Sequence, residues 1–68
     1  EIVENPLTDR ESEVLRLVAE GKTTKEIAGE LYLAPGTVRN YISTIFEKLD
    51  VGNRIEAIAR FKEKGWFR

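Results

Sequence analysis

Helix-start signals recur along this chain and divide it into segments of helical character. Thr8 with Glu11, and again Thr23 with Glu26, have the spacing of a capping box. In that motif the hydroxyl accepts from one backbone amide while the carboxylate accepts from the other. The apolar residues between these signals recur every three or four positions, and alternation of period two is absent. The sequence therefore predicts helices and no strand.

Further signals position the remaining helices. Pro35 has the fixed φ that suits a first helical position, and Asn53 can cap a helix with Glu56 three residues on. Gly21 can supply a left-handed stop for the first helix, and Gly65 a stop for the last. We expect an all-α four-helix bundle that contains a helix-turn-helix, with helices at about 9–20, 24–31, 35–49 and 54–64. Trp66 and Phe67 are expected to fold back onto this bundle.

Length and composition limit the chemistry that this chain can perform. Its 68 residues fit one small domain with a modest core. The absence of cysteine and histidine removes disulfides, thiolate sites, the commonest metal ligand and the usual general base. The carboxylates fall at caps or on solvated faces, and no nucleophile–base pair is recognisable. We therefore expect no enzyme, no catalytic residue, no cofactor and no metal site.

The ends of the sequence suggest that it is part of a longer protein. It contains no methionine, so we expect Glu1 to follow a cut, with residues 1–6 a linker remnant and 7–68 the domain. No apolar run approaches the roughly 20 residues of a membrane span, and no signal peptide is visible. We expect a cytoplasmic protein without a membrane partner.

Charge is distributed unevenly although the net charge is only −1. Residues 1–33 carry four basic and eight acidic groups, whereas residues 34–68 carry seven basic and four acidic groups. An acidic first half and a basic second half suit a domain that presents one face to a polyanion. A mixed solvated surface explains the same distribution equally well.

The third predicted helix has two distinct faces. At about 100° per residue, one face is apolar and is expected to be core. Its members are Val38, Ile42, Ile45 and Leu49, flanked by Tyr41 and Phe46. The opposite face carries Gly36, Arg39, Asn40, Ser43 and Glu47.

The polar face of this helix suits the major groove of DNA. Small Gly36 and Ser43 allow close approach, Arg39 can donate two parallel bonds to guanine, and Asn40 can pair with adenine. Glu47 would be repelled by phosphates, so the N-terminal half should insert most deeply. A short helix, a tight turn and this longer helix form a helix-turn-helix layout. An ordinary solvated helix face remains the alternative.

Six short motifs occur in an order and spacing that resemble one known family. They are LTDRE at 7–11, EVL at 13–15, KEIA at 25–28, TVRNYI at 37–42, KL at 48–49 and NRIEA at 53–57. Together they resemble the NarL/FixJ (LuxR-type) DNA-binding domain over Leu7 to about Ile58. The resemblance implies sequence-specific binding to double-stranded DNA by the effector domain of a two-component response regulator, with the third helix in the major groove.

The resemblance also implies roles for individual residues. Arg39, Asn40 and Ser43 would face base edges, and Thr37 and Tyr41 would lie near the DNA backbone. The whole DNA-binding set is Thr23, Thr24, Lys25, Gly36, Thr37, Arg39, Asn40, Tyr41, Ser43 and Lys48, with the two lysines on phosphates.

A homodimer through the fourth helix is a further implication. We expect Ile55, Ile58 and Ala59 to form the inner stripe of that helix, which leaves Ala57 and Phe61 as a second apolar stripe for a partner. The predicted dimerisation residues are Val51, Ala57, Arg60 and Phe61. Alternatively, Phe61 closes the core under Trp66. An N-terminal receiver domain and RNA polymerase are further partners consistent with the resemblance.

The sequence departs from the family pattern at three positions. Ala34 replaces a common hydroxyl cap, Tyr41 stands where histidine is frequent, and Ser43 is shorter than the lysine of some members. The competing function is a protein-interaction helix-turn-helix that does not bind DNA. Net acidity and Glu47 favour it, whereas Arg39 beside Asn40 opposes it.

Overall fold

The computed structural model describes residues 6–64, which form four helices joined by short turns. These are α1 (Asp9–Ala19), α2 (Thr24–Leu31), α3 (Pro35–Leu49) and α4 (Arg54–Glu63). The described residues contain no strand, and the predicted all-α fold is confirmed with helix ends that agree to within one residue. The predictions for residues 1–5, Gly65, Trp66 and Phe67 lie outside the described residues.

The predicted cap signals form the expected hydrogen bonds. Thr8 Oγ1 accepts from the Glu11 amide at 3.2 Å, and Glu11 Oε1 accepts from the Thr8 amide at 2.9 Å. The capping box of α2 repeats this pattern at 3.1 and 2.8 Å. Asn53 Oδ1 accepts from the Glu56 amide at 2.9 Å at the start of α4. Local sequence therefore fixes where three of these helices begin.

Left-handed residues terminate the first three helices. Gly21 follows α1 with φ of 89°, as predicted. Tyr32 and Asp50 end α2 and α3 with φ of 57° and 56°, although neither is a glycine. After Tyr32 the Leu33 amide donates to the Ala28 carbonyl at 2.9 Å, which closes the end of α2. The turn between α2 and α3 is therefore tight and defined.

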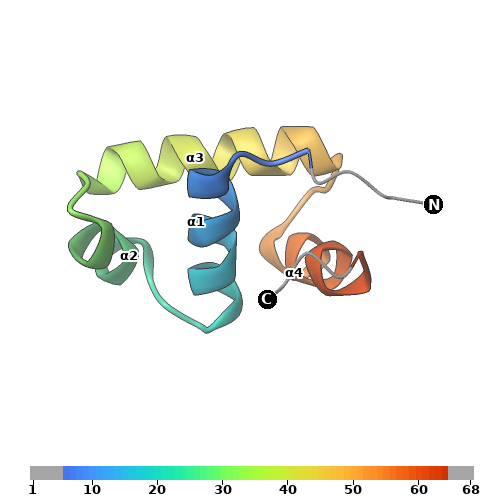
Figure 1. The fold of residues 1–68 in the computed structure, drawn as a ribbon, viewed down its shortest axis with the longest axis horizontal. Coiled ribbons are helices and arrows are strands. Elements are labelled where there is room, and N and C mark those ends of the chain that lie inside the picture. Colours follow the sequence, from blue (N-terminus) through green and yellow to red (C-terminus); the bar gives the residue numbers. More distant parts are fainter. Residues whose placement is uncertain (1–5, 65–68) are drawn as a thin grey trace.

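The longest helix, α3, forms one side of the molecule. Figure 1 shows α3 along one edge, with α2 beneath its N-terminal end, α4 beneath its C-terminal end and α1 between them. Apolar side chains from all four helices meet on the inner side of α3. The buried core residues are Leu7, Val14, Leu15, Leu17, Val18, Ile27, Ala28, Val38, Ile45, Leu49, Ala57 and Phe61.

The rotation of α4 is opposite to the one expected. Ala57 and Phe61 are 0% and 1% exposed, whereas Ile55 is 79% exposed and Ala59 is also exposed. Ile58 is half-buried. The prediction of an inner stripe was therefore wrong for Ile55 and Ala59, whereas Ile58 does pack against the core. The alternative, in which Phe61 is buried in the core, is confirmed. A phenyl ring removes more apolar surface from water than isoleucine, which favours this rotation.

Candidate nucleic-acid interface

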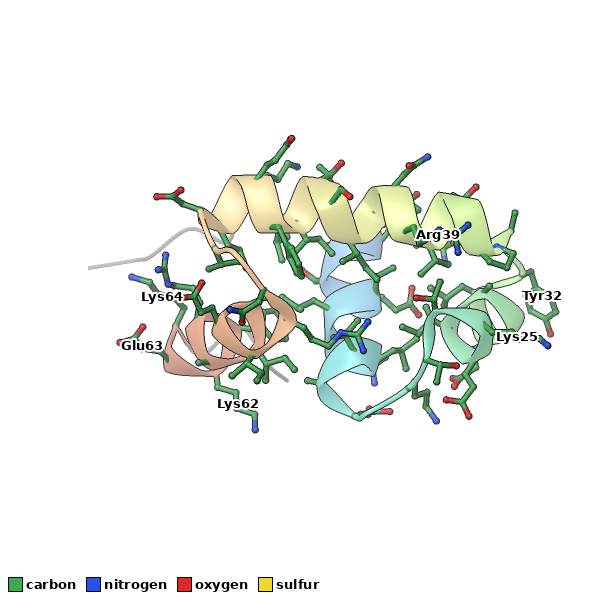
Figure 2. All side chains as sticks on the ribbon, turned by 180° about the vertical axis from the view of Figure 1, so that it is seen from behind. Lys25, Tyr32, Arg39, Lys62, Glu63 and Lys64 are labelled. Carbon is green, nitrogen blue, oxygen red and sulfur yellow. The ribbon has the colours of Figure 1, made fainter. Side chains whose placement is uncertain are left out.

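The outward face of α3 is open to solvent. Arg39, Asn40 and Ser43 are all exposed, and so is Glu47 further along the helix. No other described helix lies on this side of α3 in either view (Figures 1 and 2). The predicted division into a core face and a polar outer face is confirmed. A long flat ligand can therefore reach the outer face without any rearrangement of the domain.

Arg39 lies over the first turn of α3. Figure 2 shows it on the N-terminal half of the helix. Its Nη2 atom is 3.9 Å from the place where a Cβ on Gly36 would lie, so the guanidinium folds back toward the helix start. Because Gly36 has no side chain, the guanidinium and the backbone can approach the same surface. The planar N–H donors of Arg39 therefore lie beside a part of the helix surface that has no protruding side chain.

The N-terminus of α3 has hydrogen-bond donors without helix partners. Ala34 forms no side-chain cap, as its lack of a hydroxyl predicts, and Pro35 has no N–H. The first bond into the helix runs from the Val38 amide to the Ala34 carbonyl at 3.1 Å. The amides of Gly36 and Thr37 therefore have no acceptor within the helix. Together with the positive end of the helix dipole they favour an anion.

The start of α2 contributes a second group of polar residues. Thr23 Oγ1 accepts from the Glu26 amide at 3.1 Å, and its hydroxyl proton remains available to a phosphate oxygen. Thr24 is half-buried and Lys25 is exposed. Lys25 projects from the same end of the molecule at which α3 begins (Figure 2). This end thus combines an exposed ammonium group with the amide donors of α3.

Lys48 has a partner within the domain. Its Nζ donates to Glu11 Oε1 at 2.8 Å, and Glu11 is only 6% exposed. Burial alone would raise the pKa of Glu11, but the hydrogen bonds from Lys48 and Thr8 and the nearby ammonium charge outweigh it and lower that pKa. Lys48 therefore links α3 to α1. A phosphate would have to compete with Glu11 for this predicted DNA-binding residue.

Charge along the outer side of α3 is polarised. Arg39 lies on the N-terminal half and Lys25 lies nearby on α2, whereas Glu47 and Asp50 occupy the C-terminal end. Along the outer face of α3 itself, a polyanion is therefore attracted near Arg39 and repelled near Glu47. Tyr41, half-buried on α3, lies between these ends in sequence.

The residues predicted to form a dimer surface are engaged inside the domain. Ala57 and Phe61 belong to the core. Arg60 Nη1 donates to the Leu49 carbonyl at 2.9 Å, which joins α4 to the end of α3. Val51 is half-buried, and its amide donates to a carbonyl in the last turn of α3. The prediction that Ala57 and Phe61 face outward was wrong, because α4 is rotated.

The outer surface of α4 presents different residues. Ile55 and Ala59 are exposed there, and a shallow hollow is lined by Glu56, Ala59, Arg60 and Glu63. Sequence reasoning missed this surface because two apolar stripes competed for the core. The large volume of Phe61 was the one sequence feature that distinguished the buried stripe from the exposed one.

Two kinds of site are not found among residues 6–64. No group of three or more carboxylates is placed to hold a metal ion. None of the four helices is long and apolar enough to cross a membrane.

Known sequences that resemble this chain are bacterial regulators. Residues 5–61 match the family described as bacterial regulatory proteins, luxR family. The transcriptional regulatory protein DesR of Bacillus subtilis (strain 168) is 75% identical over 64 residues, which cover 94% of this chain and 32% of DesR. The spore germination protein GerE of the same organism is 48% identical over 59 residues, covering 87% and 80%. The chain thus spans about a third of DesR and most of GerE.

Solved structures show the same arrangement of helices. The structure of the transcription factor GerE superposes with a TM-score of 0.89 at 35% identity, covering 96% of this chain and 97% of that one. The crystal structure of the response regulator ChrA, from a heme-sensing two-component system, gives a TM-score of 0.84 at 28% identity. It aligns with 94% of this chain, which corresponds to 32% of ChrA.

Proposed function

This chain belongs to the luxR family of bacterial regulatory proteins, and we propose that it binds duplex DNA sequence-specifically. In this proposal α3 enters the major groove, and the domain is the effector domain of a two-component response regulator. The observation that carries this proposal is the outer face of α3, on which no other described helix lies and where Arg39 and Asn40 are both exposed. The major groove is wide enough to admit a helix.

Base recognition is assigned to the N-terminal half of α3. Arg39 can donate two parallel hydrogen bonds to the O6 and N7 of guanine, and Asn40 can pair with the N6 and N7 of adenine. Gly36 and Ser43 keep the helix surface low between these long side chains. Their small size supports close contact between the helix backbone and the base edges.

Contacts to the DNA backbone position this helix. Lys25 and the amides of Gly36 and Thr37 are suited to phosphate oxygens at the end of the domain where α3 begins. Thr23, Thr24 and the half-buried Tyr41 are secondary contacts. Lys48 contributes only if it exchanges Glu11 for a phosphate. The acidic groups at the other end of α3 favour an orientation in which the C-terminal half lies further from the phosphates.

Dimerisation through α4 is proposed on a corrected surface. Ile55 is 79% exposed and Ala59 lies one turn further along the same helix. Two copies related by a two-fold axis would bury this pair against itself, since an isologous contact uses the same patch on both subunits. Two half-sites about one helical turn apart would match such a dimer.

The longer protein is proposed to combine this domain with an N-terminal receiver domain. The chain corresponds to about a third of DesR and of the response regulator ChrA, which supports a second domain of larger size. RNA polymerase is a further proposed partner of the DNA-bound protein.

Selection of bound duplexes from a random pool tests the proposed function. We expect one enriched sequence with guanine or adenine at its most restricted positions, in two half-sites of opposite orientation. Recovery of no common sequence, together with binding that does not weaken as salt rises, would instead support a protein-interaction domain.

A further inference from the structure

We propose that Tyr32, in the turn between α2 and α3, is a DNA-binding residue whose phenol hydroxyl donates a hydrogen bond to a backbone phosphate beside the bases that α3 reads. This inference rests on the proposed function and adds to it a contact that neither the motifs nor the helix faces predicted. Four observations support it in turn: the backbone conformation, the exposure of the ring, its position and the charge around it.

The backbone conformation at Tyr32 is unfavourable for a bulky residue. Its φ and ψ of 57° and 44° lie in the left-handed region. Asp50 adopts the same conformation at the end of α3, but aspartate is among the residues that enter this region more readily. Glycine or asparagine at position 32 would close the turn with less strain. The turn itself therefore gives no reason for a tyrosine.

The side chain of Tyr32 adds nothing to the core. It is 94% exposed, whereas its neighbours Leu31 and Leu33 are half-buried against the core. A large ring is thus held in water by a strained backbone. Residues kept in sparsely populated conformations concentrate at functional sites, because strain persists where function requires it.

The position of Tyr32 places it next to the proposed interface. It lies three residues before Pro35, the first residue of α3. Figure 2 shows Tyr32 and Lys25 projecting from the same end of the molecule, with Arg39 on the adjoining half of α3. If this half of α3 enters the groove, the end of the molecule that carries Tyr32 meets the sugar-phosphate backbone at the edge of the groove.

The surroundings of Tyr32 favour a phosphate over a protein partner. Exposed Lys25 and the amides of Gly36 and Thr37, which have no acceptor within α3, favour an anion, and tyrosine is among the residues that donate to phosphate oxygens. Contiguous exposed apolar surface commonly marks a protein-binding site. The other large exposed hydrophobic among the described residues, Ile55, belongs to α4, which lies beneath the opposite end of α3 (Figure 1).

Two substitutions in the full chain separate the hydroxyl from the ring. Tyr32→Phe removes only the hydroxyl of an exposed residue, so its melting temperature should equal that of the unsubstituted protein. We expect it to weaken binding about 2- to 10-fold, equally on the selected duplex and on a scrambled one, because phosphates carry no sequence information. Tyr32→Gly should bind DNA no more tightly than Tyr32→Phe. Its melting temperature should equal or exceed that of the unsubstituted protein, because glycine relieves the backbone strain.

Salt dependence provides the matched control. Lys25→Gln should lower the slope of log affinity against log salt by about one, whereas Tyr32→Phe should leave that slope unchanged, because the phenol carries no charge.

Three results would overturn the proposal. Unchanged binding by Tyr32→Phe would exclude the hydrogen bond, even if Tyr32→Gly binds weakly through loss of the ring. A loss confined to the selected duplex would show that Tyr32 reads a base. Failure of the unsubstituted protein to bind any duplex would overturn the proposed function as well, whereas the first two results would leave that function intact.

Discussion

Two residues on α3 differ in how they would contact DNA: Arg39 has a long side chain, and Gly36 has none. Arg39 extends a planar donor over the first turn of the helix, and Gly36 leaves the space into which it folds. Glu11 holds Lys48 on the other side of the same helix. Each of these residues can be changed separately, and each change has a distinct expected effect.

Replacement of Arg39 by alanine tests base recognition. We expect a loss of about 1–3 kcal/mol on the selected duplex and reduced discrimination at one base pair. Titration of that duplex and of its single-base variants measures both effects. Arg10→Ala is the matched control, because Arg10 is an exposed arginine on α1 that pairs with Glu13 at 3.4 Å. An equal loss on every duplex would show that Arg39 contacts only phosphate.

Gly36→Ala separates stability from DNA affinity. A Cβ at position 36 would meet only Arg39 Nη2, at an ordinary contact distance of 3.9 Å, so the fold accommodates it. The free energy of unfolding should rise by about 0.4–1 kcal/mol, because alanine restricts the unfolded chain. DNA affinity should nevertheless fall, because the methyl group holds the helix away from the bases.

The comparison for this variant is Gly29→Ala, whose new Cβ would meet nothing within 4 Å in α2. It should give a similar gain in denaturant unfolding without the loss of affinity. Tighter DNA binding by Gly36→Ala would contradict close approach at this position.

Glu11 should make folding stability depend on pH. Its folded-state pKa lies below the usual value of 4.5, so ionised Glu11 stabilises the domain above about pH 4.5. That contribution is lost as the pH falls through the folded-state pKa. Glu11→Gln should therefore lower the free energy of unfolding by about 1.5–3 kcal/mol near neutral pH and progressively less at acidic pH.

Urea unfolding over a range of pH measures this difference. Glu13→Gln on the same helix is the control, because its exposed pair with Arg10 should contribute little. A constant gap between Glu11→Gln and the unsubstituted protein at all pH values would contradict the role of the ionised carboxylate.

At the scale of helices, starts and stops could be predicted from sequence but rotation could not. Capping boxes, Pro35 and Gly21 act within three or four residues, so their effect is local and visible in the sequence. The outer face of α3 was also predictable, because its two sides differ sharply in polarity. The faces of α4 were not, because both carry apolar residues and only packing against α1 and α3 selects Phe61.

Substitutions on the two faces of α4 should change the free energy of unfolding by very different amounts. Phe61 is 1% exposed, so Phe61→Ala should lower the free energy of unfolding by about 3–5 kcal/mol. Ile55→Asp should change the stability of the monomer by less than about 0.5 kcal/mol, because Ile55 is exposed. Thermal unfolding of both variants at low protein concentration distinguishes them. A larger loss from Ile55→Asp would contradict the observed rotation.

At the scale of the whole molecule, contacts between distant residues limited the prediction of the site. Lys48 and Glu11 are 37 residues apart, so no local pattern indicates their ion pair. Tyr32 was missed because its left-handed backbone is set by the turn between α2 and α3, where a glycine would have been the usual signal. The base-reading residues were predictable because they share one helix.

The corrected α4 surface predicts how two molecules bind together. Ile55→Asp should leave binding to a single half-site unchanged and remove cooperativity on paired half-sites, because two aspartates would face each other across the two-fold axis. Gel-shift titrations on one and two half-sites measure this. Lys64→Asp, an exposed change at the C-cap of α4 on a different side from Ile55, should retain cooperativity. Full cooperativity in Ile55→Asp would place the dimer contact elsewhere.

The proposed function requires that the outer face of α3 lie against base pairs. An NMR titration of the isotopically labelled chain with the selected duplex tests it residue by residue. We expect the largest amide shifts at Gly36, Arg39, Asn40 and Ser43, with small shifts along α1. Shifts concentrated on α1 or on the outer face of α4, with α3 unaffected, would contradict it.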